Sequence, residues 1–159
     1  MRALIQRVTR AHVRIDGSIT GAIENGLVVF IGVKEGDGKT DSEYLSQRIA
    51  ALRIFNDEES KMNLSLQDVG GSVLVVSQFT LHADTRRGNR PSYVAAAKPE
   101  TAEKLYNHFI DELRSILGAD RVASGVFRAM MQVELVNDGP VTLMLPSKSE
   151  QPDATSDVE

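Results

Sequence analysis

The run Leu27–Val33, LVVFIGV, constrains the fold of this chain more than any other segment. It is apolar throughout, and most of its side chains are β-branched. A continuous apolar run of this length, without polar alternation, is typical of a strand that is buried on both faces of its sheet. It is far shorter than the roughly 18 residues that a membrane-spanning helix needs. We therefore expect a central strand with other elements packed on each face.

Alternation of apolar and polar residues predicts a hairpin before this strand. Residues 11–15 alternate with a period of two, and the turn-forming pair Asp16-Gly17 follows them. Ile19–Ile23 is then expected to return as the second strand of the hairpin. Asn25-Gly26 is a second expected turn, because this pair favours positive backbone φ angles.

Further strands are predicted later in the chain. Gly70-Gly71 precedes SVLVVSQFTL, whose first half is apolar and whose second half turns polar, as in a strand that emerges from a core. Residues 131–135 alternate up to the turn-forming run Asn137-Asp138-Gly139-Pro140. Val141–Leu145 is expected to continue as the final strand.

Two helices are predicted between the strands. Thr40-Asp41-Ser42-Glu43 has capping-box spacing and opens a helix that is expected to end near Phe55. The second helix starts at Pro99 and ends at Gly118, with apolar side chains every fourth residue at Leu105, Phe109, Leu113 and Leu117.

Neither an internal repeat nor a linker divides the chain of 159 residues. The sequence thus predicts one strand-rich α+β domain over residues 1–146, with a mixed or antiparallel sheet packed by two main helices. Residues 147–159, SKSEQPDATSDVE, are expected to form an acidic, solvated and disordered tail.

Charge and composition exclude several classes of protein. Of the 18 basic and 22 acidic side chains, the tail holds one and four, so residues 1–146 keep 17 and 18 and have no overall positive field for nucleic acid. The chain has no cysteine, which excludes disulfides and thiolate chemistry. Its first ten residues lack the apolar core of a signal peptide, so we expect a cytoplasmic protein that is not bound to membranes.

Conventional catalytic groups are mostly missing. The three histidines lack metal-binding spacing, and neither a P-loop nor a GxGxxG motif occurs, so no metal and no cofactor is expected. Thr80, His82 and Asp84 could be imagined as nucleophile, base and orienting group. However, alternate Cβ atoms on one strand lie roughly 7 Å apart, which is too far for short side chains to hydrogen bond directly. The residues alone therefore argue against such a triad.

Two segments carry polar or turn-forming groups where a core strand is expected, namely Ser77–Leu81 and Asn137–Thr142. On the residues alone, the first could be a polar strand end and the second an ordinary tight turn. However, SQFTL, the following ADTRRGNRPSY, NDGPVT and the early QRV occur together and in order. In this combination the chain resembles the D-aminoacyl-tRNA deacylase family over residues 1 to about 146.

The resemblance implies a homodimeric editing hydrolase that cleaves the ester joining a D-amino acid, or glycine, to the terminal adenosine of tRNA, and that rejects L-aminoacyl-tRNA. It implies an active site at the dimer interface and no cofactor. In the family the Gly-Pro peptide is cis and inserts from the other subunit. Carried onto this sequence, the catalytic segment is Ser77, Gln78, Phe79 and Thr80; the inserted peptide is Gly139-Pro140, braced by Arg7; and the adenosine contacts are Phe127 and Met131.

An aminoacyl ester is already activated, and the ribose 2′-hydroxyl can help to position water, so such a site needs orientation and oxyanion stabilisation more than a strong base. Backbone N–H groups near Phe79 and Thr80 could hold the oxyanion, and the carbonyls of Gly139 and Pro140 could form the wall that rejects L-residues. For tRNA phosphates the predicted contacts are Arg86, Arg87 and Arg90. Two other functions stay open: a noncatalytic RNA-binding module, and a Thr- or Ser-dependent hydrolase of small esters or amides.

Overall fold

Strand β1 (Arg2–Ile15) is paired along both of its edges in the computed structural model, which describes residues 1–151. Strand β8 (Gln132–Pro146) runs antiparallel along one edge, from Arg14↔Gln132 to Arg2↔Pro146. The other edge is taken first by β2 (Ser18–Ile23) and then by β3 (Gly26–Gly32). The predicted hairpin at Asp16-Gly17 is confirmed, since β1 and β2 pair directly on either side of it.

The turn expected at Asn25-Gly26 is wrong. Ala11 pairs with Ile23 and Val8 with Gly26, so β2 and β3 follow one another along the same edge of β1, and the chain bends there without reversing. A Cβ on Gly26 would collide with the carbonyl oxygen of Ser72 on the neighbouring strand. Glycine is therefore required by the close approach of two strands.

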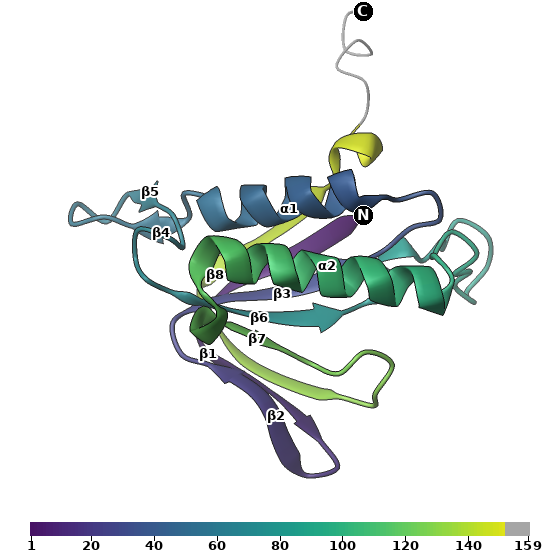
Figure 1. Cartoon of the computed structure of the whole chain (residues 1–159), viewed down its shortest axis with the longest axis horizontal. Helices are drawn as coiled ribbons and strands as arrows, with labels where there is room; N and C mark the ends of the chain where they lie inside the picture. Colours follow the sequence, from purple (N-terminus) through teal and green to yellow (C-terminus); the bar gives the residue numbers. More distant parts are fainter. Residues whose placement is uncertain (152–159) are drawn as a thin grey trace, which may run out of the picture.

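The sheet continues from β3 through two parallel strands, β6 (Ser72–Ser77) and β7 (Val122–Ser124). Parallel neighbours need crossover connections. Helix α1 (Lys39–Ala51) and the small hairpin of β4 (Phe55–Asn56) and β5 (Met62–Leu64) connect β3 to β6. Helix α2 (Pro99–Leu117) connects β6 to β7. Both helices lie over the same face of the sheet (Figure 1). The expected α+β class, with a mixed sheet and two main helices, is confirmed.

Strand β3 is buried on both faces, as LVVFIGV predicted. Leu27, Val29 and Ile31 point toward the helices and join the larger core with Phe109 of α2. Val28 points to the opposite face. There it belongs to a second apolar cluster, whose buried members are Val8, Ala11, Val13, Ile23, Val28, Leu74 and Val76. The central strand thus separates two apolar clusters and places the end of its neighbour β6 between them.

The helix boundaries differ from the prediction for α1 and agree for α2. Helix α1 begins at Lys39, one residue before the expected start, and the Asp41 carboxylate accepts the Gly38 N–H at 3.0 Å. It ends at Ala51, well before Phe55, because Leu52 adopts an extended backbone. Helix α2 starts at Pro99 and is followed by Gly118 with φ +99°, as expected. None of the helices within residues 1–151 is long and apolar enough to cross a membrane.

Asn137-Asp138-Gly139-Pro140 does not form a turn between two strands. It lies inside β8, which runs without a break from Gln132 to Pro146. The pairing with β1 shifts register on either side of Val8, so the segment is a bulge in a long strand. The Asn137 side-chain amide donates to the carbonyl oxygens of Arg7 at 2.9 Å and Val141 at 3.1 Å. These bonds replace ladder bonds at the bulge.

Residues 147–151 depart from the expected solvated tail. Ser147 is fully buried, and Lys148–Glu150 form a single 3₁₀ turn, η3, beside the N-terminus (Figure 1). Arg2 Nε donates to Glu150 Oε2 at 3.1 Å, and Lys34 Nζ lies 3.4 Å from Oε1. These ionic contacts, which polar composition alone does not reveal, hold the segment against β1. The rest of the expected tail, 152–159, lies outside the described residues.

We predict that Glu150→Ala lowers the free energy of unfolding by about 1–2 kcal/mol, because the side chain is nearly buried and its loss leaves Arg2 and Lys34 without their shared carboxylate. Lys148→Ala is the matched control: its side chain is exposed in the same turn, so a change within about 0.5 kcal/mol is expected. Urea unfolding followed by circular dichroism measures both. Equal effects of the two substitutions would contradict this role of Glu150.

Candidate active site

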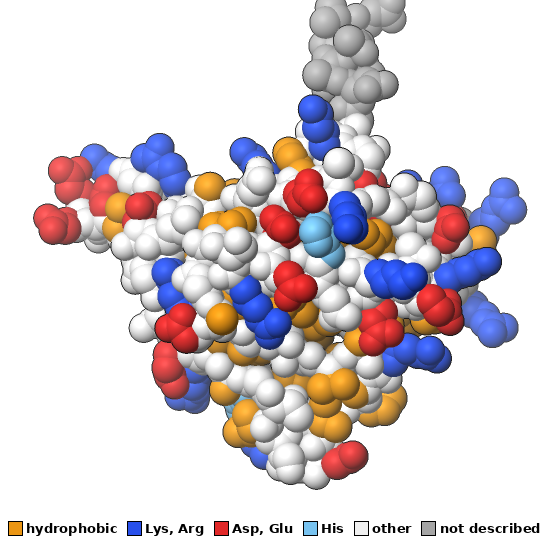
Figure 2. Space-filling model, viewed as in Figure 1, with side chains coloured by type: hydrophobic (Ala, Val, Ile, Leu, Met, Phe, Trp, Pro, Cys, Tyr) orange, Lys and Arg blue, Asp and Glu red, His pale blue; other side chains and the backbone are white. Residues whose placement is uncertain are grey.

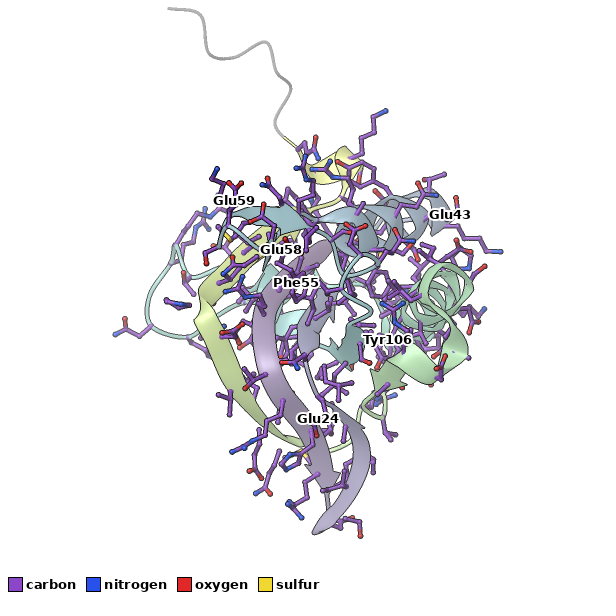
Figure 3. All side chains as sticks on the ribbon, turned by 90° about the vertical axis from the view of Figure 1, so that its left-hand side faces the viewer. Glu24, Glu43, Phe55, Glu58, Glu59 and Tyr106 are labelled. Carbon is purple, nitrogen blue, oxygen red and sulfur yellow. The ribbon has the colours of Figure 1, made fainter. Side chains whose placement is uncertain are left out.

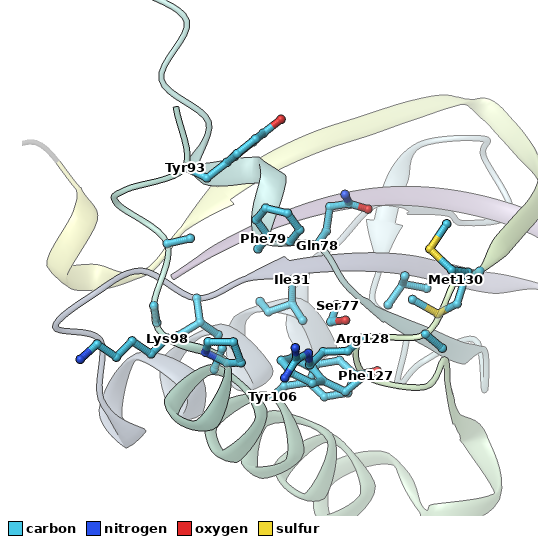
Figure 4. A pocket seen from close by; sticks show the side chains of 18 of the residues that line it. Ile31, Ser77, Gln78, Phe79, Tyr93, Lys98, Tyr106, Phe127, Arg128 and Met130 are labelled. Atoms are coloured by element: carbon cyan, nitrogen blue, oxygen red, sulfur yellow. The ribbon is translucent and has the colours of Figure 1, made fainter. Parts of the chain in front are cut away.

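A pocket of about 810 Å³ opens beside the carboxyl end of β6 (Figure 4). Its walls come from β3, β6, the segment 93–99, helix α2 and the segment 127–131 that leads into β8. The volume is in the range of small-molecule sites. Apart from Lys98 and Arg128, none of the lining residues carries a charge, and none is an aspartate or glutamate. The pocket therefore offers apolar and aromatic surface with no carboxylate to act as a base.

The first three residues of the SQFTL segment, Ser77, Gln78 and Phe79, line this pocket. Strand β6 ends at Ser77, and the Gln78 N–H donates to the Ile31 carbonyl oxygen at 2.8 Å, which extends the pairing with β3 by one residue. The short 3₁₀ helix η1 (Phe79–His82) follows. The first N–H groups of a helix have no partner inside it. Within residues 1–151, no backbone acceptor is found for the N–H of Phe79 or Thr80.

Two aromatic pairs shape the pocket. Phe79, with 55% of its surface exposed, meets Tyr93 edge to face, with ring centroids 5.1 Å apart. Tyr106 and Phe127 lie 5.7 Å apart. Exposed aromatic faces suit the stacking of a nucleobase. The sequence patterns do not identify Tyr93 or Tyr106 as site residues. Tyr106 could have been found, because its hydroxyl is the one polar group on the buried apolar face of α2 and a buried hydroxyl needs a hydrogen-bond partner.

Tyr106 is a structural member of the site. Its ring points from α2 toward the sheet (Figure 3), and its hydroxyl donates to the Val75 carbonyl oxygen at 3.1 Å. Burial raises the pKa of Tyr106 to about 12. The phenol is therefore neutral at ordinary pH and anchors α2 to the strand that carries the SQFTL segment.

The structure brings together five of the residues expected at the site. They line the pocket from the end of β6 and from the segment before β8: Ser77, Gln78, Phe79, Phe127 and Met131. Thr80 lies in η1 but is not among the lining residues, and its hydroxyl accepts a hydrogen bond from the Gln78 side-chain amide. The remaining expected residues, Arg7, Gly139, Pro140, Arg86, Arg87 and Arg90, lie outside this pocket.

Arg7 and the Gly139 bulge are in direct contact. Arg7 is buried; its Nη1 donates to the Ile54 carbonyl oxygen at 2.6 Å, and its Nε lies 3.3 Å from the Asp138 carbonyl oxygen and 3.1 Å from Asp138 Oδ2. Gly139 has φ +116°, and a Cβ there would collide with Arg7 Nη2. Position 139 therefore favours glycine, because of its positive φ and because a Cβ would contact the buried Arg7 side chain.

The cis peptide that the resemblance implied at Gly139-Pro140 is absent, since no peptide bond in the described residues is cis. The trans form is the favoured state of an X–Pro bond. Here the chain changes direction through the positive φ of Gly139 and the register shift of β8. The expected cis Gly139-Pro140 peptide is therefore wrong for this structure, in which the bond is trans.

Comparison with known proteins shows the family to which the chain belongs. The family model described as D-Tyr-tRNA(Tyr) deacylase matches residues 4–146. A relative from Koribacter versatilis (strain Ellin345), named D-aminoacyl-tRNA deacylase, is 57% identical over 150 residues, which cover 94% of this chain and 99% of the relative. The chain belongs to the D-aminoacyl-tRNA deacylase family. A relative of the same name from Fervidobacterium nodosum is 55% identical and covers 93% of this chain and 98% of its own length.

Two solved structures share the fold of this chain. One described as a c-Myc DNA Unwinding Element Binding Protein has a TM-score of 0.89 and 40% identity, covering 92% of this chain and 99% of its own. Another, described as a probable eukaryotic D-amino acid tRNA deacylase, has a TM-score of 0.77 at 17% identity and shows the shared fold. The family expected from the motifs is confirmed, and the roles of single residues stay predictions.

In this deacylase-family chain, the polar side chains of Thr80 and Asp84 around η1 are already hydrogen bonded within the protein. Thr80 is bonded to Gln78, and Asp84 is held by Arg86 at 2.7 and 2.9 Å, which keeps the pKa of Asp84 far below its usual range. His82 is buried with Nδ1 3.9 Å from Glu150 Oε1, and burial lowers its pKa. Thr80, His82 and Asp84 thus point to different partners and form no triad.

The loop that carries Arg86, Arg87 and Arg90 follows η1 in the chain. Arg86, Arg87 and Arg90 are all exposed, and Arg86 is neutralised by Asp84. On the face seen in Figure 2, basic and acidic side chains are intermixed, in keeping with the small net charge. Only Arg87 and Arg90 of the three are without an ion pair inside the described range.

We predict that one tyrosine of the folded protein titrates near pH 12 and that Tyr106→Phe removes this step. Between the ordinary tyrosine pKa of about 10 and the folded value of about 12, the unfolded chain loses the proton and the folded chain keeps it, so stability falls as pH rises through this window. Ultraviolet absorbance of tyrosinate measures the titration. Tyr93→Phe is the control and keeps the step; a parent protein without a late-titrating tyrosine would contradict the assignment.

Proposed function

We propose that this chain hydrolyses the ester between a D-amino acid, or glycine, and the terminal adenosine of tRNA, and that it spares L-aminoacyl-tRNA. The observation that carries the proposal is the pocket itself: its aromatic walls lie beside the start of η1, where the Phe79 and Thr80 N–H groups have no acceptor within residues 1–151, and its lining has no carboxylate or histidine. Two of its relatives are named D-aminoacyl-tRNA deacylase. Aminoacyl-tRNA is a cytoplasmic substrate, so the proposal includes a cytoplasmic location.

The adenosine would occupy the apolar part of the pocket. Phe127 and Met131 both line the pocket, and the Phe127 ring, which packs beside Tyr106, gives the base a flat surface on which to stack. The ribose and its 3′-ester then reach toward Ser77 and the start of η1. This placement brings the ester carbonyl to the Phe79 and Thr80 N–H groups.

Hydrolysis in this arrangement depends on the backbone. Water attacks the ester carbonyl carbon, the carbonyl oxygen becomes an oxyanion held by the two N–H groups, and the ribose 3′-oxygen leaves and takes up a proton. Each oxyanion donor is worth about 2.7–4 kcal/mol in comparable enzymes. The neighbouring 2′-hydroxyl of the substrate orients the water and supplies a route for the proton, so a side-chain base is not required.

Selectivity and assembly are joined in the proposal. Gly139 and Pro140 do not line the pocket of their own chain. Within the described residues, β8 pairs only with β1, so its outer edge is free, and Val136, Leu143 and Met144 along it are exposed. We therefore include a homodimer in which the Gly139-Pro140 carbonyls of a second copy close the pocket and leave no room for an L side chain.

The test is deacylation of matched D- and L-aminoacyl-tRNA by the purified protein, with Thr80→Ala beside the parent. We expect hydrolysis of the D-substrate alone and a Thr80→Ala rate within about tenfold of the parent, because the N–H remains. Loss of a true nucleophile costs about 10⁴-fold or more. A substrate ending in 2′-deoxyadenosine should still bind but should be hydrolysed far more slowly.

Four outcomes would contradict the proposal. Intact D-aminoacyl-tRNA would indicate a noncatalytic RNA-binding module. A loss of about 10⁴-fold in folded Thr80→Ala would indicate a side-chain nucleophile, as would rapid cleavage of small esters that lack the ribose. Equal rates for the ribose and deoxyribose substrates would indicate a protein base.

We also predict that Gly139→Ala lowers the D-over-L discrimination at least about tenfold, which corresponds to about 1.4 kcal/mol. The new Cβ displaces Arg7 and turns the bulge. Gly36→Ala is the control, because Gly36 also has a positive φ but nothing lies near its Cβ position. Deacylation rates give the discrimination, and light scattering should give the parent twice the 17.4 kDa chain mass. A selective monomer would refute the shared site.

A further inference from the structure

One arginine ties the turn η3 to the segment η1. Arg2 Nε donates to Glu150 Oε2 of η3 at 3.1 Å, and Arg2 Nη1 donates to the Leu81 carbonyl oxygen of η1 at 3.2 Å. We propose that Arg2 and Glu150 are positioning residues for deacylation, which fix η1 and with it the Phe79 and Thr80 N–H groups. The inference rests on the proposed function, and it adds two residues outside the pocket lining on which the rate depends.

The strand register brings Arg2 next to η1. Arg2 of β1 pairs with Gly32 at the end of β3. A Cβ on Gly32 would lie 3.1 Å from Leu81 Cβ and 2.8 Å from the Gln78 carbonyl oxygen, so glycine allows η1 to pack directly on the end of this strand. The segment is therefore held by the packing on β3 and by the guanidinium of the residue that pairs with Gly32.

Segment η1 is a single turn, so a contact at its end also affects its beginning. The Leu81 N–H donates to the Gln78 carbonyl oxygen at 3.3 Å, and the Ala83 N–H donates to the Thr80 carbonyl oxygen at 3.1 Å. The last carbonyl groups of a helix have no partner inside it, and Arg2 supplies one at Leu81. A shift of Leu81 would therefore change the direction of the N–H groups at the start of the turn.

Glu150 gives the guanidinium a fixed anchor. The Arg2 side chain is 41% exposed, whereas that of Glu150 is only 5% exposed. The turn η3 that carries Glu150 is itself attached to the start of β1, because the Ser147 N–H donates to the Met1 carbonyl oxygen at 2.8 Å. A guanidinium is planar and presents its N–H groups at fixed angles, which a lysine ammonium does not. Anchoring Nε on the carboxylate thus also sets the direction of Nη1 toward Leu81.

The effect expected of this contact is on the rate more than on stability. A partly exposed ion pair contributes little to folding. By contrast, a displacement of about 1 Å in an active site can cost about a hundredfold in rate. Loss of the Arg2 side chain should therefore leave the protein folded but hold the oxyanion donors less precisely. Binding of the substrate should hardly change, since neither Arg2 nor Glu150 lines the pocket.

The experiment measures kcat and KM for D-aminoacyl-tRNA in Arg2→Ala, in Glu150→Ala and in the double variant. We expect kcat to fall about tenfold in each single variant, with KM within about twofold of the parent. The double variant should lose the same factor of about ten, because both substitutions interrupt one contact. Two independent contributions would instead multiply to about a hundredfold.

Lys34→Ala is the matched control. Lys34 Nζ lies 3.4 Å from Glu150 Oε1, and the Lys34 side chain is 44% exposed, so it meets the same carboxylate as Arg2 at a similar exposure. Within residues 1–151 no hydrogen bond joins the Lys34 side chain to η1, so kcat should stay within about twofold of the parent. Arg2→Lys keeps the charge without the two-bond bridge, and it should keep the stability of the parent but not its kcat.

Amide hydrogen exchange of Leu81 and Ala83 tests the positioning without any substrate. Both amides should exchange faster in Arg2→Ala than in the parent or in Lys34→Ala, because the turn opens more often. This result in a parent that does not cleave D-aminoacyl-tRNA refutes the proposed function alone. An active parent in which Arg2→Ala matches Lys34→Ala in kcat and exchange overturns the positioning role, and so does a multiplied loss in the double variant.

Discussion

The pairing of β1 along both edges is the interaction on which the rest of the structure depends. One edge carries β8 for almost the full length of the strand, and the other carries β2 and β3 in succession. This arrangement fixes β3 as the strand that β6 joins in parallel. Since both faces of β3 are buried, the carboxyl end of β6 emerges at a defined position between two apolar clusters.

The candidate site is the consequence of how β6 ends. The strand is buried up to Val76, and the chain then turns into η1, whose first two N–H groups have no acceptor within residues 1–151. In most proteins such donors are satisfied by a cap or by water. Here η1 begins beside a pocket whose walls are mostly aromatic or aliphatic and hold no carboxylate, so the backbone at this point offers free hydrogen-bond donors near an incoming ester.

Position, more than number, decides what the charged side chains can do. The body of the chain is nearly neutral, and many of its charges are paired, among them Arg86 with Asp84 and Arg2 with Glu150. Arg7 is buried and is used to hold the Asp138-Gly139 bulge. Lys98 and Arg128 are exposed residues of the pocket lining and make no ion pair within residues 1–151.

The sequence by itself determined the central strand, the hairpin at Asp16-Gly17, helix α2 and the family, because these depend on local side-chain patterns and on contiguous motifs. Only the tertiary structure decided that Asn25-Gly26 and Asn137–Pro140 continue strands, since pairing with β1 overrides their local preference for turns. The same holds for Lys98, Tyr106 and Arg128. They are far from SQFTL along the chain, and the crossover through α2 and the return from β7 bring them to the same pocket.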